Sequence, residues 1–198
     1  SNITYGNNAT LTVTLNSGAT GKVTITVNGV DREVDIVKGK SSFTVVNPAA
    51  GKYIVVVSYD GDRNFTGVTI NTEFEVAQIS PDMAVDVANI TYGANATVTV
   101  TVNKQVTGKV NITVNGVSHI VDILNGKATL SVSGLAAGDY TVTARYINGG
   151  NFANATVDTE FTVSKANPGM DVDVSTFDYG TKANVTVTVN DKATGSVT

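Results

Sequence analysis

Residues 89–103 read NITYGANATVTVTVN, and the same pattern occurs twice more in the chain. Residues 2–16 read NITYGNNATLTVTLN, and residues 176–190 read TFDYGTKANVTVTVN. The tyrosines of these three stretches, Tyr5, Tyr92 and Tyr179, are each 87 residues apart. Self-similarity at a fixed period is typical of repeat architectures. The sequence therefore predicts an array of 87-residue units.

The period divides the 198 residues into three units of unequal completeness. We expect a first repeat at residues 1–78 that lacks its first strand, and a complete second repeat at residues 79–165. A partial third repeat, residues 166–198, would contribute two strands and the start of a third. Half a sandwich cannot bury its inner face, so we expect this end to be cut from a longer chain or to need a partner.

The second repeat reads as a succession of short strands. Val98, Val100 and Val102 alternate with threonines, and a period of two places valine on the core face and threonine outside. Asn115-Gly116 and Asn125-Gly126 are hairpin signals because both turn positions need positive φ. Seven short strands at roughly ten-residue spacing predict an all-β sandwich. These strands are expected at residues 83–87, 98–102, 110–114, 120–124, 128–132, 140–146 and 157–163.

The connections between repeats, residues 77–81 and 164–168, are short, and each contains a proline. Proline stiffens a linker, and neither segment resembles a long flexible tether. We therefore expect neighbouring repeats to lie end to end as a rod.

Composition excludes several functions. Charged residues make up only 15% of the chain and the net charge is −4, which disfavours nucleic acid and anionic membranes as partners. Cysteine is absent, which excludes disulfides and thiolate chemistry. No apolar run is long enough for membrane insertion. The only histidine, His119, has no partner residues for a metal site or a catalytic base. We expect no enzyme, no catalytic residue, no metal and no cofactor.

Residues 48–55 read PAAGKYIV and residues 135–142 read LAAGDYTV. Both resemble the E–F corner of immunoglobulin (Ig)-like domains, where a tyrosine at the start of strand F bonds to the upstream backbone. The resemblance gives Tyr53 and Tyr140 this structural role. With the Tyr-Gly before the second strand, the Asn-Gly turns and the closing TEFTVSKA, the chain resembles the Ig-like repeats of prokaryotic adhesin-like surface proteins. Its threonine- and asparagine-rich composition is most similar to those of methanogenic archaea. The fold class implied is tandem immunoglobulin-like β-sandwiches of about seven strands each.

Eight asparagines begin Asn-x-Thr sequons, which are acceptor signals for N-glycosylation. These candidate glycosylation sites are Asn2, Asn8, Asn64, Asn89, Asn95, Asn111, Asn154 and Asn184. An asparagine- and threonine-rich composition also generates some sequons by chance.

The resemblance implies an extracellular, cell-surface protein whose repeats form a structural stalk that projects a distal region. Its partners would be neighbouring repeats, and glycans or other cells would be contacted only through regions outside this chain. One alternative is a subunit of a self-assembling extracellular filament, in which identical chains complete each other by strand exchange. Another is a carbohydrate- or protein-binding module that uses its loops. The aromatic candidates for such binding are Phe65 and Phe152, for which core packing is the favoured role.

Overall fold

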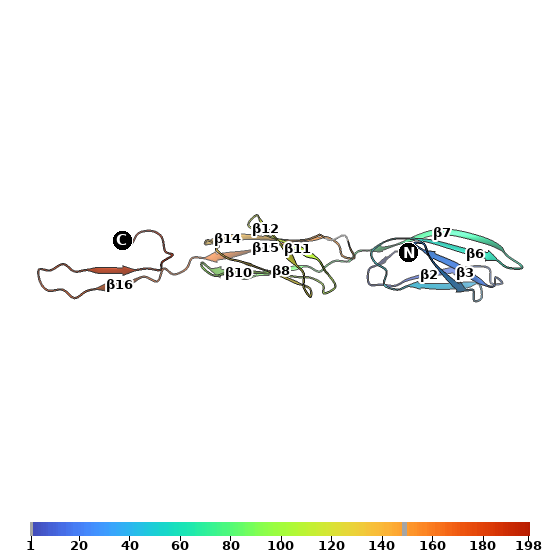
Figure 1. The fold of residues 1–198 in the computed structure, drawn as a ribbon, viewed down its shortest axis with the longest axis horizontal. Coiled ribbons are helices and arrows are strands. Elements are labelled where there is room, and N and C mark those ends of the chain that lie inside the picture. Colours follow the sequence, from blue (N-terminus) through green and yellow to red (C-terminus); the bar gives the residue numbers. More distant parts are fainter. Residues whose placement is uncertain (1, 148–149) are drawn as a thin grey trace.

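The computed structural model describes residues 2–147 and 150–198 of the chain. The described residues form β-strands joined by turns, with no helix among them. The three repeats follow one another along the longest axis of the molecule (Figure 1). This arrangement agrees with the predicted all-β fold class.

The second repeat is a sandwich of two sheets. One sheet has five strands in the order β12 (Val117–Asp122), β11 (Lys109–Val114), β14 (Gly138–Tyr146), β15 (Ala155–Ser164) and β9 (Ile90–Thr91). The other has three strands in the order β13 (Lys127–Val132), β10 (Ala96–Thr101) and β8 (Ala84–Val87). All neighbouring strands are antiparallel except β9, which pairs in parallel with the end of β15.

The core of the second repeat lies between these two sheets. Val98 on β10 and Ile112 on β11 have no exposed surface, and Val142 on β14 is equally buried. Burying a side chain of this size contributes roughly 1.5–3 kcal/mol. The threonines that alternate with valine on β10 are half-buried or exposed. The predicted alternation therefore places the side chains as expected.

The first repeat has the same plan with one difference. Its five-stranded sheet runs in the order β1 (Ile3–Thr4), β7 (Thr66–Ala77), β6 (Gly51–Gly61), β3 (Lys22–Val27) and β4 (Val30–Asp35). Its other sheet contains only β2 (Ala9–Thr14) and β5 (Lys40–Val45). Within the described residues, β2 pairs on one side only, and the edge that corresponds to the β8 side of β10 is open.

The third repeat contributes a single antiparallel pair, β16 (Asp171–Val174) and β17 (Val185–Thr188). Every residue of both strands is exposed. Residues 196–198, which were expected to begin a third strand, form none in the structure. A strand needs a neighbour for its backbone hydrogen bonds, and residues 196–198 pair with no strand in the structure.

Two further strands differ from the prediction. The strand expected at residues 120–124 lies at Val117–Asp122, because Asn115 and Gly116 make a two-residue turn at positive φ and Val117 pairs at once with Val114. No strand was expected between residues 87 and 98, yet this stretch contains β9, whose two residues pair with Val163 and Ser164. A strand of two residues has no periodicity that a sequence could reveal.

Candidate functional site: the joint between the first and second repeats

The first and second repeats meet in a defined joint. Tyr5 follows β1 and is fixed there because its backbone N–H donates to the carbonyl of Ala77 at 2.9 Å. The second repeat brings the loop between β14 and β15 to the same place, with Asn151 and Phe152 at its centre. For a chain of stacked repeats, this contact sets how one unit sits on the next.

An aromatic pair forms the apolar part of the joint. The rings of Tyr5 and Phe152 meet edge to face, with their centroids 5.8 Å apart and their planes at 71°. This geometry suits the ring quadrupoles and contributes about 0.5–1.5 kcal/mol beyond the area that is buried. Tyr5 packs against the cores of both repeats, and Phe152 is only 5% exposed. Phe152 therefore fills a structural position and is not open to a ligand.

Hydrogen bonds from the first repeat hold the same loop. The backbone N–H of Ala50 donates to Asn151 Oδ1 at 2.8 Å. The side chain of Gln78 donates from Nε2 to the carbonyl of Gly150 at 2.7 Å. Each such bond contributes about 0.5–1.5 kcal/mol net, and its geometry fixes the relative orientation of the two repeats.

The linker itself is part of the joint. Ile79 N–H donates to the carbonyl of Asn151 at 3.2 Å, and Ala153 N–H donates back to the carbonyl of Ile79 at 2.9 Å. Further along, Pro81 is buried and its carbonyl accepts a bond of 2.7 Å from the N–H of Asn103. The linker was expected to be stiff because it contains proline. These hydrogen bonds restrain it further.

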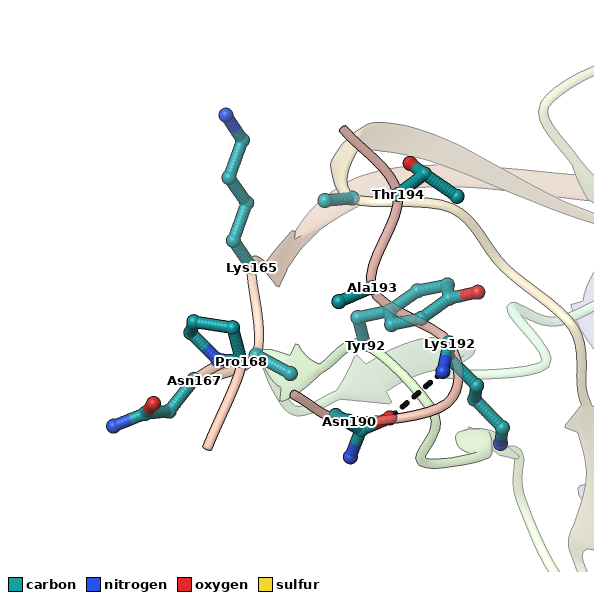
Figure 2. Close-up of a pocket in the computed structure, with 10 residues that line it drawn as sticks. Tyr92, Lys165, Asn167, Pro168, Asn190, Lys192, Ala193 and Thr194 are labelled. Carbon is teal, nitrogen blue, oxygen red and sulfur yellow. Dashed lines mark hydrogen bonds between the residues drawn. The ribbon is translucent and has the colours of Figure 1, made fainter. Parts of the chain in front are cut away.

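The boundary between the second and third repeats carries a pocket at the corresponding place (Figure 2). It has a volume of about 440 Å³, and Tyr92, which corresponds to Tyr5, is 41% exposed in it. The third repeat supplies one wall, where Asn190 N–H donates to the carbonyl of Pro168 at 2.6 Å. The ten lining residues are Tyr92, Ala137, Lys165, Ala166, Asn167, Pro168, Asn190, Lys192, Ala193 and Thr194.

An aspartate braces the loop between β6 and β7 at the far end of the first repeat. Asp62 Oδ1 accepts the backbone N–H groups of Asn64 and Phe65 at 2.8 and 2.9 Å. Its other oxygen, Oδ2, accepts the N–H and the hydroxyl of Thr20 at 2.9 and 2.8 Å. The bonds from Asn64 and Thr20 hold the pKa of Asp62 well below its usual range, against an opposing contribution from burial. The corresponding residue of the second repeat, Gly149, lies outside the described residues.

The eight sequon asparagines do not form one site. Seven are exposed, and they are distributed over all three repeats: Asn2, Asn8, Asn64, Asn89, Asn95, Asn154 and Asn184. Asn111 is half-buried on β11 between its cross-strand neighbours Ile120 and Arg145, and its Oδ1 is buried without a hydrogen-bond partner among the described residues. The side chain of Asn111 is therefore less accessible than those of the other seven candidate glycosylation sites.

The two corner tyrosines hold the loops that precede β6 and β14. The Tyr53 hydroxyl donates to the carbonyl of Ala49 at 3.0 Å, and the Tyr140 hydroxyl donates to that of Ala136 at 3.1 Å. Each ring also stacks on a buried phenylalanine, with centroid distances of 4.8 Å to Phe74 and 5.3 Å to Phe161. These tyrosines serve the fold of each repeat.

His119 lies on β12 opposite Ile112, at a half-buried position. Within residues 2–147 and 150–198, no three histidine, aspartate or glutamate side chains are placed to hold a metal ion. Over the same residues, no helix has the length and apolar character needed to cross a bilayer.

Comparisons with known proteins indicate which class of protein this chain is similar to. A family model described as a bacterial Ig-like domain (group 3) matches residues 83–164. No curated protein matches the chain. A pair of titin domains in complex with telethonin is 16% identical, with a TM-score of 0.50 over 84% of this chain and 93% of that one.

Two further solved structures are similar. A fragment of consecutive titin domains is 16% identical, with a TM-score of 0.51 over 96% of this chain and 72% of that one. The fibronectin(III)-like modules of Clostridium thermocellum CbhA are 12% identical, with a TM-score of 0.37 over 83% of this chain and 89% of that one. At such identities the likeness concerns the fold. Together with the sheet order and the family match to the second repeat, the likeness to the two titin structures defines the chain as an Ig-like repeat protein built of tandem β-sandwiches.

Proposed function

We propose that the chain is a segment of the stalk of an extracellular, adhesin-like cell-surface protein of the prokaryotic, methanogen type. The stacked repeats project a distal region away from the cell. The observation that carries this proposal is the joint, in which Tyr5, Ala50 and Gln78 of the first repeat hold the Asn151–Phe152 loop of the second. A spacer can set a distance only if its units keep a fixed orientation, and these contacts supply that orientation.

The surface location is supported by three observations of different kinds. The second repeat matches a bacterial Ig-like domain family. Seven sequon asparagines are exposed and accessible to a glycan. Thr-rich outer faces, such as that of β10, give a hydrated surface with few charges.

Small-angle X-ray scattering of residues 1–198 tests the rod. We expect a maximum dimension that matches the extended arrangement of Figure 1 at a concentration where the chain is monomeric. A double variant, Asn151→Ala with Gln78→Ala, is expected to give a broader distribution of interatomic distances, because two of the bonds across the joint are lost. A compact distribution for the unaltered chain would refute the stalk.

The location has its own test. Intact cells that produce the protein are treated with a protease that cannot enter them, and released peptides are identified by mass spectrometry. We expect peptides from this chain among the released fragments. Their appearance only after cell lysis would contradict the surface location while leaving the rod geometry untouched.

A further inference from the structure

We propose that β12 is a self-association site, at which the second repeats of two copies of this chain pair edge to edge and antiparallel. The contact is centred on Ile120, which lies opposite Ile120 of the second copy. The pairing depends only on residues inside the second repeat. Its consequence, that paired stalks stand on different cells, rests on the proposed function.

The strand β12 forms one edge of its five-stranded sheet and has free main-chain groups. Among the residues that the structure describes, it pairs with β11 alone. The N–H of Ile123, just after β12, donates to the carbonyl of Gly108 at 2.8 Å. Because alternate residues of a strand direct their main-chain groups to opposite sides, Ser118, Ile120 and Asp122 direct theirs away from β11. These groups are available to a further strand.

The side chains of these three residues suit pairing. Ile120, in the middle, is 71% exposed. Asp122 Oδ1 accepts a bond of 2.7 Å from Lys109 Nζ, so its charge is already paired. Ser118 is small and exposed, and its hydroxyl lies 3.0 Å from that of Thr113. An exposed edge strand with an apolar centre and no unpaired charge is a template for pairing with another chain.

The corresponding edge strand of the first repeat, β4, is protected against such pairing. By the same alternation, its outward main-chain groups belong to three acidic residues, Asp31, Glu33 and Asp35. The Arg32 guanidinium also donates to the carbonyl of Asp31 at 2.8 Å and occupies one of these outward acceptors. Like charges opposite each other are destabilising, and charged residues are a common protection of edge strands. A second β12 is therefore a better partner for β12 than β4 is.

The side chains of β12 select one register. A pair centred on Ile120 sets Ile120 opposite Ile120 and Ser118 opposite Asp122, so apolar groups face apolar groups and polar groups face polar groups. A shift in one direction would set His119 opposite His119, and a shift in the other would set Asp122 opposite Ile120. Matched cross-strand pairs stabilise a sheet. The matched register is also two-fold symmetric, as the contacts of most homodimers are.

This symmetry determines the direction of the two rods. A two-fold axis between antiparallel strands stands normal to the sheet and reverses every direction within it. The strands β10 and β15 run along the longest axis of the molecule, so the sheets contain the axis of the rod (Figure 1). The paired rods therefore point in opposite directions. Stalks on one cell all project outward, and an antiparallel pair thus joins stalks of two cells.

Sedimentation velocity of unglycosylated residues 1–198 over a range of concentrations tests the pairing. One short strand is a small interface, so we expect a monomer–dimer equilibrium with a Kd on the order of 0.1 mM. Ile120→Glu and Ile120→Lys should each weaken it about tenfold or more, because like charges then face each other. An equimolar mixture of the two variants should recover the dimer. The fold accepts the charge, since Glu33 occupies this position in the first repeat.

Ile54→Lys is the matched control. Ile54 is 59% exposed, but it lies on β6, which pairs with a strand on each side. This variant should dimerise as the native chain does. A native chain that stays monomeric well above the expected Kd would overturn the proposal, as would a mixture of the two Ile120 variants that does not recover the dimer.

Site-specific cross-linking tests the register, because the chain contains no cysteine. A Ser118→Cys variant is mixed with an Asp122→Cys variant and treated with a short bismaleimide. We expect a linked heterodimer, since positions 118 and 122 face each other in the antiparallel pair. Either variant alone should link poorly, because its two copies of the cysteine lie about 13 Å apart along the strands. Equal yields from the mixture and from either variant alone would contradict the register.

Chains attached to beads by one terminus test the joining of opposed stalks. All rods on one bead point outward, so antiparallel pairs form only between beads. We expect beads that carry the native chain to cluster. Beads with Ile120→Glu should stay dispersed, and they should cluster when mixed with beads that carry Ile120→Lys. Dispersed native beads would overturn the joining of two cells, whereas the scattering and protease tests of the stalk would be unaffected.

Discussion

Tyr5 and Phe152 lie 147 positions apart in the sequence, yet their rings meet edge to face at 5.8 Å across the boundary of two repeats. The contact belongs to neither sandwich alone, because Tyr5 packs against the core of each. Rotation of one repeat on the other would separate the rings and break the hydrogen bonds around them. The joint therefore fixes the orientation of one repeat relative to the next, and so the direction of the rod.

Asn151→Ala should loosen this joint. The substitution removes the acceptor for the N–H of Ala50, and loss of one partner from such a bond costs roughly 1–3 kcal/mol. We expect both repeats to stay folded and to reorient more independently. Amide ¹⁵N relaxation, which reports the tumbling of each repeat, measures this. Asn154→Ala, three residues along and exposed, is the matched control. Identical relaxation for the two variants would show that the bond does not order the joint.

Asp62→Asn should change how the first repeat responds to acid. The hydrogen bonds from Asn64 and Thr20 lower the pKa of Asp62 in the folded state. A carboxyl with a lowered folded pKa stabilises the fold fully above its unfolded pKa of about 4, and this contribution is lost as pH falls towards the folded pKa. We therefore expect the native first repeat to lose stability below about pH 4.

The variant should be less stable than the native chain at pH 7 and should lose less on acidification. Urea unfolding at pH 7 and pH 3 measures both effects. Asp60→Asn removes the same charge two residues away and should leave the midpoint at pH 7 unchanged. If Asp62→Asn and the native chain show equal differences between the two pH values, the carboxylate does not brace the loop.

Tyr140→Phe should remove one hydrogen bond without disturbing the ring stack on Phe161. The hydroxyl loses its bond to the carbonyl of Ala136, which corresponds to about 0.5–1.5 kcal/mol of stability. Thermal unfolding followed by circular dichroism should show a lower transition for the second repeat. Tyr179→Phe, in the third repeat, is fully exposed and should have no effect. An unchanged transition temperature would show that the hydrogen bond of the tyrosine corner does not stabilise the second repeat.

Glycan occupancy should follow side-chain exposure if the protein is glycosylated in its natural host. Asn111 is half-buried with its Oδ1 enclosed, whereas Asn154 is exposed in the same repeat. A glycosyltransferase must reach the amide nitrogen, so we expect lower occupancy at Asn111. Glycopeptide mapping by mass spectrometry gives the occupancy of each sequon. Equal modification at the two sites would contradict this order, and bare peptides at every sequon would remove glycosylation altogether.

Sequence periodicity was sufficient to predict the strands that form the core. Val98, Val100 and Ile112 are buried as their alternation predicts, because the period of a strand is a local property of the backbone. Asn115-Gly116 likewise makes the expected turn, with both residues at positive φ. The strand that follows begins three residues earlier than predicted, since the turn itself fixes where pairing begins.

The joint could not be predicted in the same way. Phe152 packs in the core of its own repeat, as expected, but its additional contact with Tyr5 depends on how two folded units sit on each other. A signal was present in the repetition of Tyr-Gly and Asn-Phe at the 87-residue period, although a repeated residue can serve the core or an interface equally well. Only the placement of both units distinguishes these roles.

The parallel pairing of β9 with β15 has a mechanical consequence. Ile90 pairs with Val163 and Thr91 with Ser164, at the end of the second repeat from which the chain leaves for the third. Tension on the chain would draw β9 back towards the first repeat and Ser164 away from it. The force would then act across the hydrogen bonds of this pair together and would not open them one at a time. Once β8 has separated from β10, these two residues, which carry no periodic signal, form the next contact that tension loads in shear.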